Sequence, residues 1–229
     1  MTSFSAFDSR GYRTVVPREG YDRWARTYED TVEDAMDIAL LDRVAVDWSA
    51  VGAAADLGCG TGRTGAWLKA RGVGEIDGVD LSPGMLAAAR ARGVYRSLRE
   101  AEVGATGLAS GAYDLVVSCL VDEHLAELAP LYVEAARLGR PGAPFVLVGF
   151  HPHFIIASGM PTHFDDAESG ESVAIETHVH LLSDHVAAGL GAGLTLAALQ
   201  ERVVDDEVLA RKPKWERFSG HPVSFAFLW

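Results

Sequence analysis

The chain has few cysteines, no long apolar run and little positive charge. Of its 229 residues only Cys59 and Cys119 are cysteine, too few for the disulfide frameworks of small secreted proteins. No stretch approaches the ~20 continuous apolar residues of a transmembrane helix. The N-terminus, MTSFSAFDSRGYR, lacks the apolar segment of a secretory signal. We therefore expect reduced thiols, no membrane partner and a cytoplasmic location.

The charge balance is strongly acidic. Lys and Arg number 20 against 32 Asp and Glu, which gives a formal net charge of −12. Binding to nucleic acid requires clustered cations that neutralise phosphates, so we expect no nucleic-acid partner. The local exception is a run of four arginines, Arg90, Arg92, Arg96 and Arg99, which we interpret as a solvated helix and loop surface. With 48% hydrophobic residues, the chain can form one domain with a substantial core, with or without a cap.

The most informative stretch is AAADLGCGTG. An apolar run closes in Asp56, and a turn with glycine at Gly58, Gly60 and Gly62 follows. A second apolar run, in GEIDGVDL, ends at Asp80. Glycines let the backbone bend sharply and approach a ligand, and an acid at the end of the second strand can accept hydrogen bonds from two ribose hydroxyls. This unit of strand, glycine loop, helix, strand and acid predicts a nucleoside-binding site.

Strands and helices alternate through the middle of the chain. We expect strands at 53–58, 75–81, 94–102, 113–120 and 144–150, and helices at 63–71, 83–92 and 122–138. Ser82 and Pro83 suit a helix start, with Ser as the cap and Pro at the first helical position. LTLAALQERVV and PVSFAFLW predict two final strands. Continuous apolar strands that alternate with helices predict an α/β fold with a parallel sheet covered on both faces.

Two segments flank this alternation. For residues 1–48 we expect an arm followed by a helical lid. The apolar side chains at helical spacing are Ala35, Ile38, Leu41, Ala45 and Trp48. The remainder, 49–229, forms the main domain. Inserted after its fifth strand, residues 151–181 contain too many Pro, Gly, His and acidic residues for a crossover helix. They predict a lid or substrate loop.

The end of this insertion alternates as a short half-exposed strand. Val173, Ile175, Thr177, Val179 and Leu181 share one face, and Glu176, His178 and His180 share the other. After it, Ser183 is expected to cap a helix that runs to about residue 193.

DLGCGTG together with VDLSPGML resembles the class I S-adenosylmethionine (SAM)-dependent methyltransferases. Dehydrogenases have a different glycine spacing, GxGxxG, and bind a pyrophosphate. The similarity continues through Glu102, YDLVVSCLVDEHL and RLGRPGAPFVLVGF, and covers roughly residues 20 to 150. Two mild departures are Glu102, where the family usually has Asp, and Ala143, in place of a second Gly. The resemblance implies a Rossmann-like seven-stranded, mostly parallel sheet with helices on both faces and an antiparallel last strand.

The resemblance also implies that SAM is the cofactor. The glycine loop would hold its amino-acid end, Asp80 its ribose, and Glu102 would lie near the adenine amino group. The expected cofactor-binding residues are Tyr21, Tyr28, Asp56, Gly58, Cys59, Gly60, Gly62, Asp80, Leu81, Met85, Glu102, Val103 and Ser118.

The loops after the fourth and fifth strands are expected to face the methyl group. The sequence HPHF leaves the fifth strand there, so His151 and His153 are the first candidates for a catalytic base. The alternative is that one of them caps the strand and bonds the backbone. A base is needed only where the acceptor is a hydroxyl or a protonated amine. We interpret His124, in DEHL, as a cofactor-side or structural residue rather than a base.

Aromatic and histidine side chains of the flanking segments are candidate substrate contacts. Tyr21, Trp24 and Tyr28 share one helical face. They either pack the N-terminal helix onto the core or form a lid whose rings favour the cationic sulfonium. Trp215 is expected in the core or in an acceptor pocket. The expected substrate-binding residues are Trp24, His124, Phe154, Met160, His163, Phe164, His178 and His180.

Glu176, His178 and His180 have the spacing of metal ligands, and His163 could join them. We interpret that face as solvated or substrate-facing and expect no metal.

We therefore expect an enzyme that transfers a methyl group from SAM to an oxygen or nitrogen atom of a small molecule. One alternative is an enzyme that uses SAM for another reaction, such as cyclisation of its aminobutyryl chain. The other is a non-catalytic SAM-binding subunit. A homodimer is compatible with the sequence.

Overall fold

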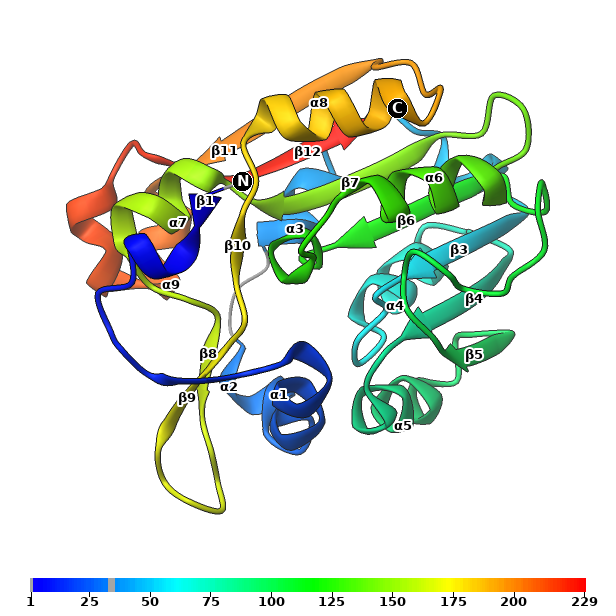
Figure 1. Cartoon of the computed structure of the whole chain (residues 1–229). Coiled ribbons are helices and arrows are strands. Elements are labelled where there is room, and N and C mark those ends of the chain that lie inside the picture. The colour runs from blue at the N-terminus through cyan, green and yellow to red at the C-terminus, as the bar shows by residue number, and fades with distance from the viewer. Residues whose placement is uncertain (1, 33–35) are drawn as a thin grey trace.

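The computed structural model describes residues 2–32 and 36–229 (Figure 1), so the predicted helical position Ala35 lies outside the described residues. Its main sheet has seven strands in the order β11-β12-β7-β6-β3-β4-β5. Their bounds are β3 Ala53–Leu57, β4 Glu75–Asp80, β5 Ser97–Glu100, β6 Leu115–Cys119, β7 Phe145–Phe150, β11 Ala198–Val203 and β12 Pro222–Leu228. β12 is antiparallel to both of its neighbours, whereas the other pairs are parallel. This arrangement confirms the predicted seven-stranded sheet with an antiparallel last strand.

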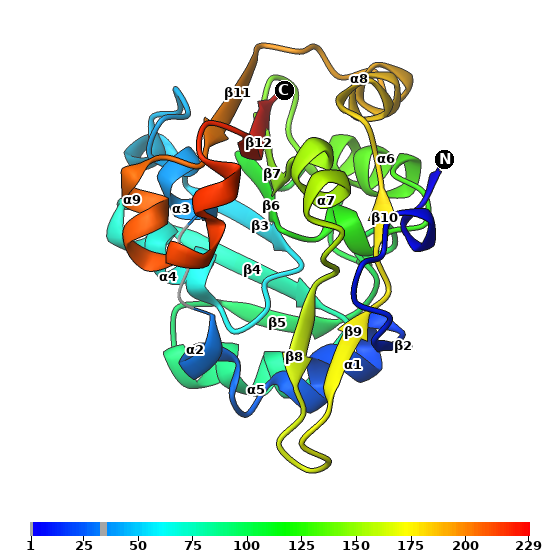
Figure 2. The same cartoon turned by 90° about the vertical axis from the view of Figure 1, so that its left-hand side faces the viewer.

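Helices cover both faces of the sheet (Figure 2). α3 (Met36–Leu41) and α4 (Arg63–Ala70) pack apolar side chains against one face. α6 (Ala129–Leu138) and α8 (Leu182–Gly191) pack against the other. The central strands are therefore buried on both sides, which explains why their sequences are continuously apolar rather than alternating.

Two predicted elements of the main domain differ most from the structure. β5 begins only at Ser97. The predicted helix at 122–138 is split into a 3-10 turn, η3 (Asp122–His124), and α6. Pro130 explains the split, because proline is tolerated only in the first turn of a helix. By contrast, α5 (Pro83–Arg92) begins as predicted, with Ser82 Oγ accepting the Met85 N–H at 3.1 Å.

The N-terminal segment is less helical than predicted. Besides α3, its elements are β1 (Thr2–Ser3), η1 (Phe4–Ala6), β2 (Arg13–Val15), α1 (Pro17–Trp24), α2 (Tyr28–Thr31) and the 3-10 turn η2 (Trp48–Ala50). β2 was not expected, because its three residues, Arg13–Val15, are too few to show the alternation of a strand. It pairs in parallel with β9 (Ser172–Ile175), far away in the sequence.

Residues 151–181 contain a short helix that the sequence did not predict. α7 (Pro152–Ser158) has Pro at its first position, and Gly159, at φ +58°, ends it in the left-handed conformation. The expected single strand is also broken, into β9 and β10 (His178–Val179), which belong to different sheets. β10 pairs with β1, and β9 pairs with β2 and with β8 (His163–Asp165). As a result His180, predicted on the exposed face, is buried.

The elements β2, α1, β8 and β9 form what we call the cap. Val15, Trp24, Phe164, Val173 and Ile175 make its own small apolar core. In Figure 2 the cap strands lie beside α1, away from α6 and α8. The two flanking segments of the sequence thus build one structure.

The C-terminal part contains α8, α9 (Asp206–Arg211) and the 3-10 segment η4 (Pro213–Phe218). α8 begins at Leu182, one residue before the predicted cap Ser183, and Asp184 Oδ2 accepts the Leu181 N–H at 2.9 Å. Within the described part of the chain, no helix combines the length and apolar character needed to cross a membrane.

Candidate functional site

The loop that follows β3 is shaped by its glycines. Gly58, Gly60 and Gly62 have φ values of +75°, +52° and +85°, a region that side chains disfavour. The N–H groups of Gly58 and Cys59 both donate to the Val79 carbonyl, at 2.8 and 2.9 Å, which holds the loop against the end of β4. A Cβ atom at Gly58 would lie 2.2 Å from Val121 Cγ2, so this position also needs glycine for space.

Asp80, at the end of β4, faces the same loop. Its Oδ2 accepts the Gly60 N–H at 2.8 Å, and its Oδ1 accepts the Ser82 N–H at 2.9 Å. Burial raises its pKa, and these backbone hydrogen bonds oppose the shift. A carboxylate can accept about four hydrogen bonds, so each oxygen can accept one more from a ligand.

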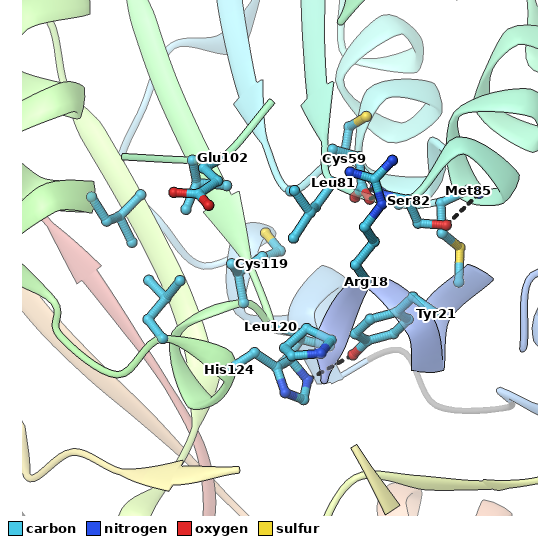
Figure 3. A pocket seen from close by; sticks show the side chains of 18 of the residues that line it. Arg18, Tyr21, Cys59, Leu81, Ser82, Met85, Glu102, Cys119, Leu120 and His124 are labelled. Atoms are coloured by element: carbon cyan, nitrogen blue, oxygen red, sulfur yellow. Dashed lines mark hydrogen bonds between the residues drawn. The ribbon is translucent and has the colours of Figure 1, made fainter. Parts of the chain in front are cut away.

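A cavity of about 490 Å³ opens beyond the carboxyl ends of β3, β4 and β6 (Figure 3). Its wall contains His124 and ten of the predicted cofactor-binding residues. These ten are Tyr21, Tyr28, Gly58, Cys59, Gly60, Asp80, Leu81, Met85, Glu102 and Val103. Arg18, Asp37 and Arg63 add charged groups to the wall. The predicted residues thus come together around one space.

Three predicted cofactor-binding residues lie behind the wall instead, namely Asp56, Gly62 and Ser118. Asp56 Oδ2 accepts the Tyr95 hydroxyl at 2.7 Å, and burial raises the Asp56 pKa to about 7. Ser118 Oγ donates to the Leu57 carbonyl at 2.9 Å and so ties β6 to β3. The Gly62 N–H donates to the Cys59 carbonyl at 2.8 Å, within the loop itself.

Polar contacts hold α1 and α2 over the cavity. Asp22 Oδ1 accepts the Ser82 hydroxyl at 3.1 Å and the Gly84 N–H at 2.7 Å, at the start of α5. Glu29, on α2, accepts the Thr61 hydroxyl and pairs with Arg92 at 2.8 Å. The N-terminal segment is therefore fastened to the same loop and helix that line the cavity.

A second cavity of about 150 Å³ adjoins the first. Tyr21, Tyr28 and Leu120 line both. Leu120 follows β6 with φ +58°, and among the described residues it is the only non-glycine with a positive φ. The strained backbone places a side chain at the boundary of the two spaces.

The second cavity is mainly apolar and aromatic. The remaining residues of its wall are Trp24, Val32, Glu123, Phe150, Phe154, Ile155, Met160, Pro161, Thr162, His163, Thr177, Lys212 and Trp215. Among these are the predicted substrate contacts Trp24, Phe154, Met160 and His163. Trp215, which was expected either in the core or in an acceptor pocket, lines the cavity as well. Trp215 serves both, because it also packs against Phe154, with ring centroids 4.6 Å apart.

Tyr21 and His124 meet where the cavities join, as the dashed line in Figure 3 shows. His124 Nδ1 lies 2.7 Å from the Glu176 carbonyl, which can only accept, so Nδ1 carries the proton. Nε2 therefore accepts the Tyr21 hydroxyl at 2.8 Å. Burial lowers the pKa of His124 to about 4 and raises that of Tyr21, so both are neutral at pH 7.

Glu123 is the site residue that the sequence analysis missed. It is only 2% exposed, and it is one of the residues that line the second cavity. Burial, with the negative charge of Asp122 as a second cause, raises its pKa well above the usual range of a carboxyl. The sequence signal that could have identified Glu123 is its place in DEHL, directly after an expected strand. Of these residues, only His124 was predicted as a site residue.

The two histidines predicted as catalytic belong to neither cavity wall. His151 caps α7 by accepting the His153 N–H at 3.1 Å, and its Nε2 contacts Glu201 at 2.7 Å. His153 pairs with His221 at 3.1 Å. His151 thus bonds the backbone, as in the alternative, although it caps α7 and not the strand.

Three predicted substrate contacts also lie outside both walls. Phe164 is buried in the cap and stacks on Trp24. His180 is buried and bonds the Leu125 carbonyl at 2.7 Å. His178 lines a separate cavity of about 370 Å³ beside the N-terminal arm. In the described residues, no group of three or more Cys, His, Asp or Glu side chains is arranged for a metal ion.

Residues 55–147 match the sequence model of a methyltransferase domain. Methyltransferase-like protein 27 from Homo sapiens is 38% identical over 114 residues, which cover 44% of this chain and 46% of that protein. Demethylmenaquinone methyltransferase from Thermus thermophilus is 35% identical over 102 residues, 42% of this chain and 46% of that protein. The match thus spans about half the length of these curated relatives.

Among solved structures, a SAM-dependent methyltransferase from Mesorhizobium loti has the same fold, with a TM-score of 0.68 at 22% identity. The alignment covers 86% of this chain and 97% of that one. The domain match over residues 55–147, the glycine loop and the fold agree with the predicted class I SAM-dependent methyltransferase domain and with SAM as its cofactor.

The first cavity fits SAM chemically. Asp80 has acceptor capacity for ribose hydroxyls, and Leu81, Met85 and Val103 offer apolar surface for an adenine ring. The Gly60 position has open space where a Cβ would stand, so a ligand can approach the backbone there. The faces of Tyr21 and Tyr28 suit a sulfonium cation.

Proposed function

We propose that this protein transfers the methyl group of SAM to an oxygen or nitrogen atom of a small molecule held in the second cavity. The observation that carries the proposal is the pair of adjoining cavities with shared walls at Tyr21, Tyr28 and Leu120. A donor in one space and an acceptor in the other can meet at this boundary. When bound, SAM supplies an electrophilic methyl group on its sulfonium.

In this proposal the protein acts mainly by positioning. Asp80 holds the ribose, Glu102 lies at the adenine end, and the glycine loop receives the amino-acid end. Tyr21, kept neutral and directed by His124, presents its hydroxyl and ring at the junction. Fixing two reactants in line removes much of the entropic barrier of a bimolecular reaction.

The cap is proposed as the lid of the acceptor side. Trp24 from α1 lines the second cavity, and the β8–β9 segment packs on α1 through Phe164. Contacts from Asp22 and Glu29 join the N-terminal segment to the cofactor side. Closure of such a lid would exclude water from both spaces.

The first experiment is isothermal titration of the protein with SAM and with S-adenosylhomocysteine (SAH). Micromolar affinity for both is expected. A deproteinised small-molecule extract is then supplied with SAM labelled in the methyl group, and labelled products and SAH are measured. Failure to bind either compound would refute the cofactor assignment, and release of methylthioadenosine would indicate the alternative cyclisation chemistry.

A filling substitution tests the acceptor cavity separately. Met160 lines only the second cavity, so Met160→Trp is expected to abolish methyl transfer while SAM affinity stays within about threefold. Met160→Leu, which conserves volume, is the matched control and should retain activity. Full activity in a folded Met160→Trp protein would place the acceptor elsewhere. SAM binding without turnover in the parent protein would favour a non-catalytic subunit.

A further inference from the structure

Glu123 carries an unsatisfied acceptor next to the second cavity. Its Oε1 accepts the Thr162 hydroxyl at 3.5 Å and lies 3.6 Å from His124 Nε2. For Oε2, the described residues offer no hydrogen-bond partner, and the atom is fully buried. A buried polar atom without a partner destabilises a protein, so its retention at a cavity wall indicates a ligand group that completes it.

We propose that Glu123 binds the acceptor through its hydroxyl or amine hydrogen and takes that proton during transfer, and that the acceptor is a compact ring compound with one such group. This inference rests on the proposed function and adds the substrate class and the proton acceptor.

The walls around Glu123 define the substrate class. Trp24, Phe150, Phe154 and Trp215 surround the space with aromatic surface, and Met160 adds an adaptable apolar contact. A cavity of about 150 Å³ with this lining suits a small flat molecule. A carboxylate of a buried glutamate then provides the directional contact that orients it.

The neighbouring groups are less suited to accept the proton. Both ring nitrogens of His124 are engaged, one with Tyr21 and one with the Glu176 carbonyl. Asp122 lines neither cavity and points toward His185, with 3.4 Å between Oδ2 and Nε2. Its negative charge raises the proton affinity of Glu123.

The other titratable groups that face the same space are His163 and Lys212 on the cavity wall and Tyr21 and Tyr28 at the junction. The raised pKa keeps part of Glu123 protonated near neutral pH, so the fraction that can take a proton grows as pH rises. That carboxylate is a stronger base than an exposed one.

The acceptor O–H or N–H bond breaks, its proton bonds to Glu123 Oε2, and the electron pair stays on the acceptor atom. That pair forms the new bond to the methyl carbon, and the electrons of the sulfur–methyl bond remain on sulfur, which leaves SAH, methylated acceptor and protonated Glu123.

The test uses two probes of nearly equal shape, 2-naphthol and 2-methylnaphthalene, titrated into protein saturated with SAH. Only the naphthol donates a hydrogen bond, so the wild type is expected to prefer it by at least about tenfold. Glu123→Leu removes the acceptor, and the preference should fall to within about twofold. Glu123→Gln keeps an acceptor oxygen but cannot take a proton. It should still prefer naphthol yet form 2-methoxynaphthalene from SAM at least about tenfold more slowly than wild type.

Glu171→Gln, an exposed position in the loop between β8 and β9, is the matched control and should behave as wild type. Equal binding of the two probes by the wild type, or an unchanged preference in Glu123→Leu, would overturn the anchoring role. Wild-type transfer in Glu123→Gln would overturn the proton-accepting role. A protein that fails to bind SAH refutes the proposed function instead, so the two failures are distinguishable.

Discussion

Replacing Asp80 with asparagine is expected to weaken SAM binding by about 1.5–3 kcal/mol, the contribution of hydrogen bonds to a charged acceptor. In the structure both carboxylate oxygens already accept a backbone N–H, from Gly60 and from Ser82. An Asn amide has one accepting oxygen and one donating nitrogen. The nitrogen would therefore face either a backbone N–H or a ribose hydroxyl that needs an acceptor. The corresponding loss of affinity is about 10- to 150-fold.

Isothermal titration with SAM and SAH measures this effect, with thermal unfolding as the check on the fold. Glu75→Gln is the matched control, because Glu75 lies at the opposite end of β4 and its loss changes the net charge equally. Its side chain is 60% exposed and pairs with Arg96, away from the cavity. SAM affinity within twofold of wild type in a folded Asp80→Asn protein would refute the ribose assignment.

Two further predictions concern the loop behind Asp80. Because burial raises the folded-state pKa of Asp56 to about 7, above its unfolded value, the free energy of unfolding should fall as pH rises from about 4 to 7. From about pH 4 to about pH 7, the free energy of unfolding should fall less in Asp56→Asn than in wild type, by up to about 4 kcal/mol, measured by urea unfolding. An identical fall in the two proteins would contradict the raised pKa. Gly58→Ala should lower stability by about 1–3 kcal/mol and abolish SAM binding, because its Cβ would meet Val121. Gly60→Ala, at positive φ with open space, should cost less, and equal losses would exclude the steric explanation.

Local sequence was sufficient for the sheet and for the cofactor side of the site. The glycine loop, Asp80 and the Ser82 cap lie within one stretch of chain, and their chemistry depends on neighbours a few residues apart. The strand and helix pattern was readable because central strands buried on both faces must be apolar. Ten of the predicted cofactor-binding residues consequently lie around one cavity.

The acceptor side could not be predicted in the same way. The cap exists only because β2 pairs with β9, across a long separation in the sequence, and no local pattern encodes that partner. The alternation predicted after residue 172 is lost, because tertiary pairing divided the segment between two sheets and buried Ala174 and His180 as well as Val173, Ile175 and Val179.

The assignment of catalytic groups shows the same division. His151 follows a strand at the correct end of the sheet, yet the cap of α7 and the contact with Glu201 hold it away from both cavities. Glu123 directly precedes His124, and its proposed role arises from its burial, which the sequence does not display. The chain's sequence alone thus determined the class of protein and its cofactor loop, because these depend on short-range geometry. Only the tertiary structure decided which side chains face the acceptor, because that depends on which distant segments pack together.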